Sequence, residues 1–312
     1  MSTRAQSLAA AAPPRLRAAR ARWTGEWLRR QPLTLQASVS VLRSPMGLSG
    51  FSVALSFVGL AVFAPFVAPY APYEQHQGNL LQAPGGQFLL GTDELGRDLL
   101  TRVLYGARVS MVVGVLATAI GATFGVATGL LSGYLGGWVD SVIMRFYDAL
   151  LAFPGIIIGI GVISVLGPSS INVAYALALG GMPFFARLMR STVLSERERE
   201  YVFAARSIGA GDARIMLQHV LPNTLPPLLV QLSLAMGFAV LAEASLSFLG
   251  LGTQPPDPSW GSMLNDSRAY LREAPFYGLW PGLALTILLV ALNFSLRCTA
   301  RRSRSSPHEV NS

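Results

Sequence analysis

The chain has 312 residues, of which 52% are hydrophobic and 13% are charged, and its mean hydropathy is +0.46. Soluble domains carry roughly 25% charged residues, so this composition excludes an ordinary soluble domain and predicts a polytopic all-α membrane protein. All 24 basic residues are arginine and Cys298 is the single cysteine, which excludes a P-loop, a Schiff-base lysine, a disulfide framework and a thiolate-rich metal site.

The first part of the chain combines a basic tail with one apolar run. Residues 1–45 contain eight arginines and a single acid, which predicts a cytoplasmic tail. Residues 46–68 are long enough to cross about 30 Å of hydrocarbon, so we assign residues 46–105 to the first transmembrane helix and an external loop. A helix is expected to begin near Thr92 or Asp93, as an interfacial helix or as a docking surface for an external partner.

An uncharged run over residues 109–139 contains glycines at every fourth position. The run would be about 46 Å long as a helix, which exceeds one bilayer core. A stripe of glycines leaves one helix face without side chains and allows a second backbone to approach closely. We therefore predict that this face packs against another helix, of this chain or of a partner, through Gly121, Gly125, Gly129, Gly133 and Gly137.

Four further spans are predicted downstream. Residues 149–186 are too long for one span, and Gly167–Ser170 predicts a hairpin between a third and a fourth span. Pro154 is expected to kink the third span, because proline lacks the hydrogen-bond donor that an unbroken helix needs. Residues 224–249 and 276–296 are the predicted fifth and sixth spans.

The fifth span contains one acid, Glu243. A carboxylate inside a span is costly and therefore marks a candidate functional residue. The alternative is a carboxyl that lies near the interface and bonds to a neighbouring helix, and the sequence favours neither reading.

A charged segment with several glycines, Glu200–Asn223, separates the fourth and fifth spans. Its first half has apolar residues at helical spacing: Tyr201, Val202, Ala205 and Ile208. Gly209 is expected to end this helix, Asp212 to cap a second one, and Pro222 to end the second. The segment is too polar to cross a bilayer, so we predict a structured platform on the membrane surface.

The arginines are distributed unequally between the two sides of a six-span arrangement. Nineteen lie in the tails and in the connections on the side of the platform, and five lie on the other side. Because cytoplasmic loops carry an excess of arginine, we expect the platform and both termini to be cytoplasmic. The net charge of +8 is explained by this orientation rather than by binding of nucleic acid.

The platform sequence, EYVFAARSIGAGDARIMLQHVLPN, resembles the cytoplasmic EAA loop of binding-protein-dependent ABC importer permeases. The consensus residues are matched in type and spacing by Ala204, Ala205, Gly209, Leu221 and Pro222, whereas Phe203 replaces the glutamate. Three further segments are similar to the C-type permease of dipeptide, oligopeptide and nickel importers: GTDELGRDLLTRVLYGARVS, YLGGWVDSVIMRFYDALLAFPG and SLSFLGLGTQPPDPSWGSML. The resemblance covers roughly residues 38–296, and the basic tail 297–312 departs from the family pattern.

The resemblance implies a type I ABC importer permease fold with six transmembrane helices and a core over residues 106–296, including a coupling loop at 196–223. It implies a transport subunit, not an enzyme, that forms half of the pathway for peptides, nickel or related small solutes and binds no cofactor. The implied partners are a homologous second permease, two ATPase subunits that bind the ATP, an extracytoplasmic solute-binding protein and the lipid of the bacterial inner membrane. The residues implied to couple to the ATPase are Glu200, Phe203, Ala204, Ala205, Gly209, Asp212 and Pro222.

Two other functions remain as alternatives. A channel or an ion-gradient-driven transporter would place ionisable residues near the membrane midplane, and only Glu243 qualifies. An intramembrane serine protease is suggested by the motif at 47–50, but the three histidines, His76, His219 and His308, lie outside the apolar spans. No two histidines are close enough in sequence to form a local metal-binding pair, so no metal is expected.

Overall fold

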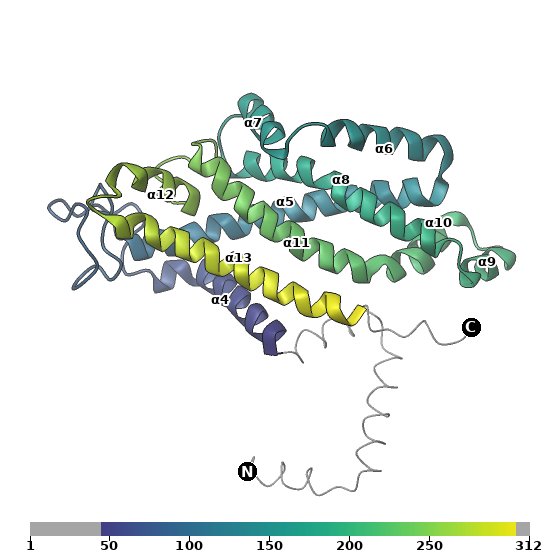
Figure 1. Ribbon diagram of the computed structural model, residues 1–312, viewed down its shortest axis with the longest axis horizontal. Helices are drawn as coiled ribbons and strands as arrows, with labels where there is room; N and C mark the ends of the chain where they lie inside the picture. Colours follow the sequence, from purple (N-terminus) through teal and green to yellow (C-terminus); the bar gives the residue numbers. More distant parts are fainter. Residues whose placement is uncertain (1–44, 304–312) are drawn as a thin grey trace, which may run out of the picture.

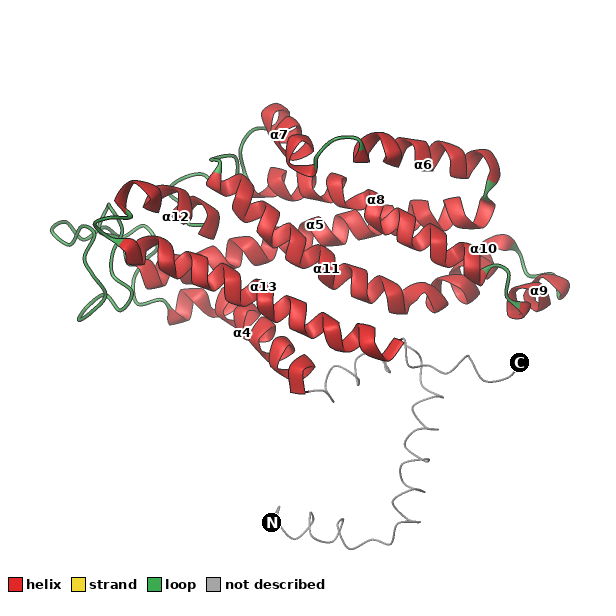
Figure 2. Ribbon diagram, viewed as in Figure 1, coloured by secondary structure: helices red, strands yellow, loops and turns green. Residues whose placement is uncertain are grey.

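The computed structural model describes residues 45–303, and the predictions for residues 1–44 and 304–312 lie outside this range. The described chain folds into helices joined by loops, with two isolated β-bridges and no strand (Figure 2). The elements in chain order are α4 (Pro45–Val67), α5 (Leu99–Leu135), α6 (Gly137–Leu151), α7 (Gly155–Leu166), α8 (Ser170–Glu196), α9 (Glu200–Ser207), α10 (Asp212–Arg214), the π-helix η1 (Ile215–Val220), α11 (Leu221–Phe248), α12 (Trp260–Ser267), the 3-10 helix η2 (Arg268–Tyr270) and α13 (Pro275–Ser303).

Four helices in the described range are long and apolar enough to cross a membrane: Leu99–Leu135, Ser170–Glu196, Asp212–Phe248 and Pro275–Asn293. Helices α6 and α7 together form a fifth candidate, bent by 90° at the break between them. Helix α4, with 23 residues, coincides with the predicted first span, and its stretch Leu55–Val67 is apolar. The all-α membrane fold is confirmed, and the count of six spans stays a prediction.

The third span differs from its prediction. Pro154 separates α6 from α7 instead of kinking one helix, since proline supplies no donor and also disfavours helical backbone in the residue before it. Helix α6 begins at Gly137, the last glycine of the predicted stripe. Gly136, with φ of +67°, ends α5 and separates it from α6.

The glycine stripe of α5 lies against α8, and these two helices share the most extensive helix contact in the described chain. A Cβ built on Gly129 would lie 2.4 Å from the Ala186 carbonyl oxygen, and one on Gly125 would lie 2.6 Å from the Met182 carbonyl oxygen. Gly121 and Gly133 face α8 in the same way. Because these glycines have no side chain, the backbones of α5 and α8 come into direct contact along the stripe.

For Gly137, the structure corrects the prediction. No atom lies within 4 Å of the place where its Cβ would be. Because α5 ends at Leu135, the last glycine of the stripe within this helix is Gly133. Gly137 instead begins α6, with φ of +56°.

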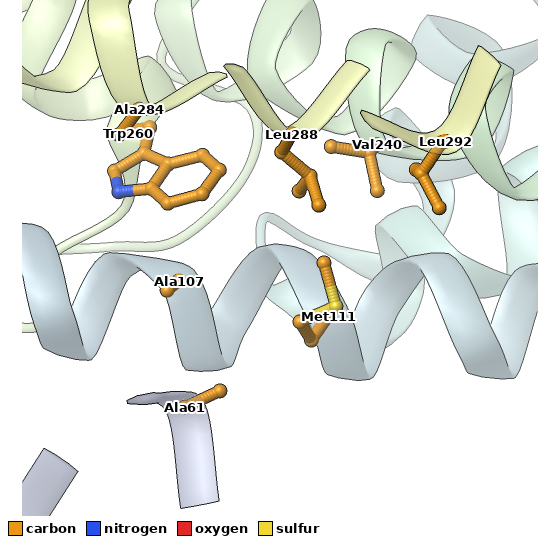
Figure 3. Close-up of a cluster of buried hydrophobic side chains, with 8 residues drawn as sticks. All are labelled: Ala61, Ala107, Met111, Val240, Trp260, Ala284, Leu288 and Leu292. Carbon is orange, nitrogen blue, oxygen red and sulfur yellow. The ribbon is translucent and has the colours of Figure 1, made fainter. Parts of the chain in front are cut away.

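At the end of the bundle that carries α12, five helices meet around one apolar cluster (Figures 1 and 3). The cluster consists of Ala61, Ala107, Met111, Val240, Trp260, Ala284, Leu288 and Leu292. The Trp260 indole is fully buried, and its Nε1 donates to the Val103 carbonyl oxygen at 2.9 Å. Burial of these side chains holds α4, α5, α11, α12 and α13 together at this end.

The loop before α5 is fixed to the bundle by buried charges. Asp98 is the N-cap of α5, because its carboxylate accepts from the Thr101 backbone N–H at 2.8 Å, so the helix begins later than Thr92 or Asp93 would place it. Asp93 is fully buried and pairs with Arg97 at 2.6 Å and with Arg102 at 3.3 Å. These groups connect the loop to α5 and do not form an exposed docking surface.

Candidate functional site

The predicted platform lies at the end of the bundle opposite α12 (Figure 1). Its inner side is a continuous apolar core shared with the ends of α5 and α8. The buried members are Leu130, Tyr134, Met189, Val193, Val202, Ala205, Ile215 and Val220. The platform is therefore packed onto the bundle and is not a loose loop.

The outer face of α9, taken here to include the C-cap residue Ile208, exposes apolar groups. Ile208 is 86% exposed and Phe203 is 55% exposed, and Ala204 between them is also exposed. The sequence pattern placed Ile208 on the buried face, but α9 ends at Ser207, so the following residue leaves the helical period and faces outward. Ala205 is only 7% exposed and packs inward, so this member of the predicted coupling set lies on the packed side of the platform.

The turn after α9 depends on Gly209. Its φ is +85°, its N–H donates to the Arg206 carbonyl oxygen at 3.0 Å, and no atom lies within 4 Å of a built Cβ. The glycine is thus required by the backbone conformation and not by crowding.

We expect Gly209→Pro to disorder this turn and Gly209→Asn to preserve it. Proline removes the N–H and fixes φ near −65°, which is opposite in sign, whereas asparagine tolerates the left-handed region. Amide hydrogen exchange over residues 200–214 should accelerate at least tenfold in the proline variant and change little in the asparagine variant. Equal exchange rates in the two variants would show that the positive φ of Gly209 does not maintain the turn.

Two tyrosines connect the platform to the spans. The Tyr134 hydroxyl, at the end of α5, donates to Asp212 Oδ1 at 2.7 Å and accepts from an Arg206 guanidinium N–H at 3.2 Å. The Tyr201 hydroxyl donates to Glu196 Oε2 at 2.8 Å and accepts from Asn223 Nδ2 at 3.3 Å. Burial first, and then the bond to Glu196, raise the pKa of Tyr201, so the phenol stays protonated as a donor.

The platform continues into the fifth span without a break. Pro222 was expected to end the second platform helix, but it lies in the first turn of α11, directly after the π-helix η1. The π-helix η1 joins α10 to α11, so Asp212–Phe248 forms one helical rod. π-Helical segments are rare and are frequent at functional sites.

The remaining predicted platform residues are near the surface. Glu200 is exposed in the first turn of α9, where a negative charge is favourable near the positive end of the helix dipole. Asp212 begins α10, and Gly211 is the N-cap in its place. The Asp212 carboxylate instead accepts from Tyr134 on α5.

A second polar cluster at this end could not be found from the sequence. Arg190 of α8 binds Asp140 of α6 in a bidentate manner, at 2.5 and 2.6 Å, and Asp140 also accepts from Ser132 of α5 at 2.5 Å. Charge-assisted bidentate pairs are the stronger class of hydrogen bond. The cluster fixes three helices next to the platform, and its members are separated by too many residues for a local pattern to show.

Glu243 lies on α11 and is fully buried. Its carboxylate accepts from Ser110 of α5 at 2.9 Å and from Ser247 of its own helix at 2.8 Å. The geometry matches the alternative in which the acid bonds to a neighbouring helix. Both of these hydrogen-bond partners lie outside the platform segment 200–223.

We expect Glu243→Gln to accumulate in membranes at close to the unmodified level and Glu243→Leu to accumulate several-fold less. Glutamine has the same shape and can bond to both hydroxyls, whereas leucine leaves Ser110 and Ser247 without this partner at a cost of roughly 1–3 kcal/mol. Immunoblots of membrane fractions and thermal melts of detergent-purified protein provide the measurement. A fully stable leucine variant would show that these hydrogen bonds are dispensable.

The described residues contain no group of three or more His, Cys, Asp or Glu side chains that could hold a metal ion. The geometry defines a class of protein: a helical protein with several candidate membrane spans and a short, ordered surface helix next to one of them. Comparison with known families narrows this class.

The family described as binding-protein-dependent transport system inner membrane component matches residues 125–304, and the N-terminal transmembrane domain of oligopeptide transport permease C matches residues 40–84. The chain belongs to the first family, as a permease subunit of an ABC importer and a multi-pass inner membrane protein, not an enzyme. The resemblance of the sequence to C-type permeases is therefore confirmed, and nothing supports the channel, secondary-transporter or protease alternatives.

Several relatives are similar over most of their length. A dipeptide transport system permease protein of Alkalihalophilus pseudofirmus is 42% identical over 261 residues, which cover 84% of this chain and 85% of that protein. A di/tripeptide transport system permease protein of Pseudomonas aeruginosa is 44% identical over 79% of this chain and 83% of the relative. A glutathione transport system permease protein of Escherichia coli is 44% identical over 80% of this chain and 83% of the relative.

A solved structure of the MetNI methionine ABC transporter in inward-facing conformations contains a chain that is similar in fold. The TM-score is 0.53 at 18% sequence identity, over 66% of this chain and 95% of that chain. This similarity supports the importer permease fold alone.

Proposed function

We propose that this chain forms half of the translocation pathway of a peptide importer and couples it to a separate ATPase through the outer face of α9. The observation that carries this proposal is the exposed pair Phe203 and Ile208 on a platform whose other side is packed onto the spans. An apolar centre with a polar rim, here Glu200 and Arg206, is typical of protein interfaces.

The continuity of the chain explains how movement at this face could reach the pathway. Helix α9 connects through the Gly209 turn to the rod Asp212–Phe248, which runs to the opposite end of the bundle (Figure 1). A displacement of α9 by a partner is therefore transmitted along α11. In this account Glu200, Phe203, Ala204 and Ile208 contact the ATPase, and Ala205, Gly209, Asp212 and Pro222 fix the geometry of the platform.

The partners follow from the family. Binding-protein-dependent transport requires a solute-binding protein outside the membrane, and the absence of lysine requires that ATP bind to other chains. We assign a homologous second permease as the other half of the pathway, with two ATPase subunits. Peptides are the proposed substrate class, because relatives more than 40% identical are named as dipeptide and di/tripeptide permeases.

The arginine asymmetry supports a cytoplasmic platform with both termini on the same side. In this arrangement residues 1–45 and 297–312 are cytoplasmic tails. Residues 46–105 supply the first transmembrane helix and an external loop, and residues 106–296 form the transport core.

The proposal is tested with the importer purified through a tag on this chain. We expect ABC ATPase subunits to co-purify, and reconstituted vesicles that contain the binding protein to take up labelled dipeptide only with ATP. Uptake by this chain alone, driven by an ion gradient, would contradict the proposal and restore the secondary-transporter alternative.

A further inference from the structure

The hydroxyl of Tyr134 is placed where three elements of the platform meet. Tyr134 lies in the last turn of α5 and is 7% exposed, with its ring in the apolar core beneath α9. Its oxygen bonds to Asp212 in α10 and to Arg206 in α9, which also face each other at 3.8 Å. The hydroxyl thus uses both its donor and an acceptor site on residues that flank the Gly209 turn.

We infer that Tyr134 is a positioning residue, which fixes the turn carrying Ile208 relative to the end of α5. This inference rests on the proposed coupling function and adds the residue that sets the geometry of the coupling face. In this turn no atom lies within 4 Å of a built Gly209 Cβ and Ile208 faces outward, so the Tyr134 hydroxyl supplies a polar link to α5 besides the packing of Ala210 against the apolar core.

The ring and the hydroxyl have separable roles. The ring contributes apolar packing that phenylalanine would retain. The hydroxyl bonds to two charged side chains that are 56% and 65% exposed, so both remain solvated when the bond is lost. Its removal therefore changes the position of the turn with little effect on folding.

Tyr201 makes a comparable connection at the other side of α9. It joins Glu196, at the end of α8, to Asn223, at the start of α11. Tyr134 thus holds α9 to α5, and Tyr201 holds it to α8 and α11. Movement of α9 is therefore transmitted to these three helices.

The test compares Tyr134→Phe with a matched control, Tyr147→Phe, in the complete importer reconstituted in lipid nanodiscs and vesicles. Tyr147 is equally buried, and its hydroxyl bonds to Thr128 at 2.7 Å between α5 and α6, away from the platform. Loss of one such hydrogen bond corresponds to about a two- to tenfold change in the equilibrium between the ordered and the opened turn. We expect Tyr134→Phe to accelerate amide exchange over residues 200–214 by this factor and to lower dipeptide uptake per ATP hydrolysed, with normal assembly.

The control variant should leave both quantities unchanged. Unaltered exchange in Tyr134→Phe, altered exchange without a change in uptake per ATP, or equal effects of the two variants would each overturn the inference. Failure of the coupling proposal itself gives a different result, in which charged variants of Ile208 transport normally while the exchange effect of Tyr134→Phe persists.

Discussion

The double variant Gly125→Ala/Gly129→Ala is expected to fail to accumulate as a folded membrane protein. The added methyl groups would lie 2.6 and 2.4 Å from backbone carbonyl oxygens of α8, so the two helices must separate. Overpacking costs typically 1–3 kcal/mol at one site, and these two sites lie in the most extensive helix contact of the described chain. Immunoblots of membrane fractions and size-exclusion profiles in detergent provide the measurement.

Gly180→Ala supplies the control, since Gly180 lies within α8 and no atom lies within 4 Å of its built Cβ. Alanine is the better helix former by roughly 1 kcal/mol, so this variant should be neutral or more stable. Normal accumulation of the double variant would show that α5 and α8 do not pack through the glycine stripe.

The second large effect is expected from Ile208→Asp combined with Phe203→Asp. Both side chains are exposed, so the substitutions leave the core of the platform intact. At a docked apolar interface, buried unpaired carboxylates are strongly unfavourable. ATP-driven uptake should fall at least tenfold, while membrane accumulation stays within about twofold of the unmodified protein.

Ser195→Asp is the matched substitution, because Ser195 is exposed at the end of α8 but does not belong to the outer face of α9. This variant should transport normally. Loss of uptake in both cases would indicate a general effect of negative charge at this end of the bundle and would argue against a specific docking face.

Composition and periodic pattern predicted the class of protein and most of the helices. The glycine period on α5 predicted a close helix contact, because spacing along a straight helix fixes which residues share a face. The break at Gly209 was also predicted, since a glycine between two helical patterns marks a left-handed turn.

Features that depend on residues far apart in the chain were not predicted. The orientation of Ile208 depends on where α9 ends, because a residue after the helix no longer follows the rotation of about 100° per residue that sets the faces of a helix. The bonds from Tyr134 to Asp212 and from Arg190 to Asp140 join separate helices, so no local spacing reveals them. Pro222 does not end the platform helix as predicted, because the π-helix η1 before it leads into α11 without a break.

The most direct test of coupling replaces Ile208 by photoreactive benzoylphenylalanine in the assembled importer and identifies what it cross-links under illumination. A covalent product with an ATPase subunit, whose yield changes when ATP binds, is the result expected from a docked α9. Leu80, which is exposed in the loop before α5, is the control position and should give no such product. If position 208 instead reacted only with lipid or with the solute-binding protein, the platform would not be the ATPase contact.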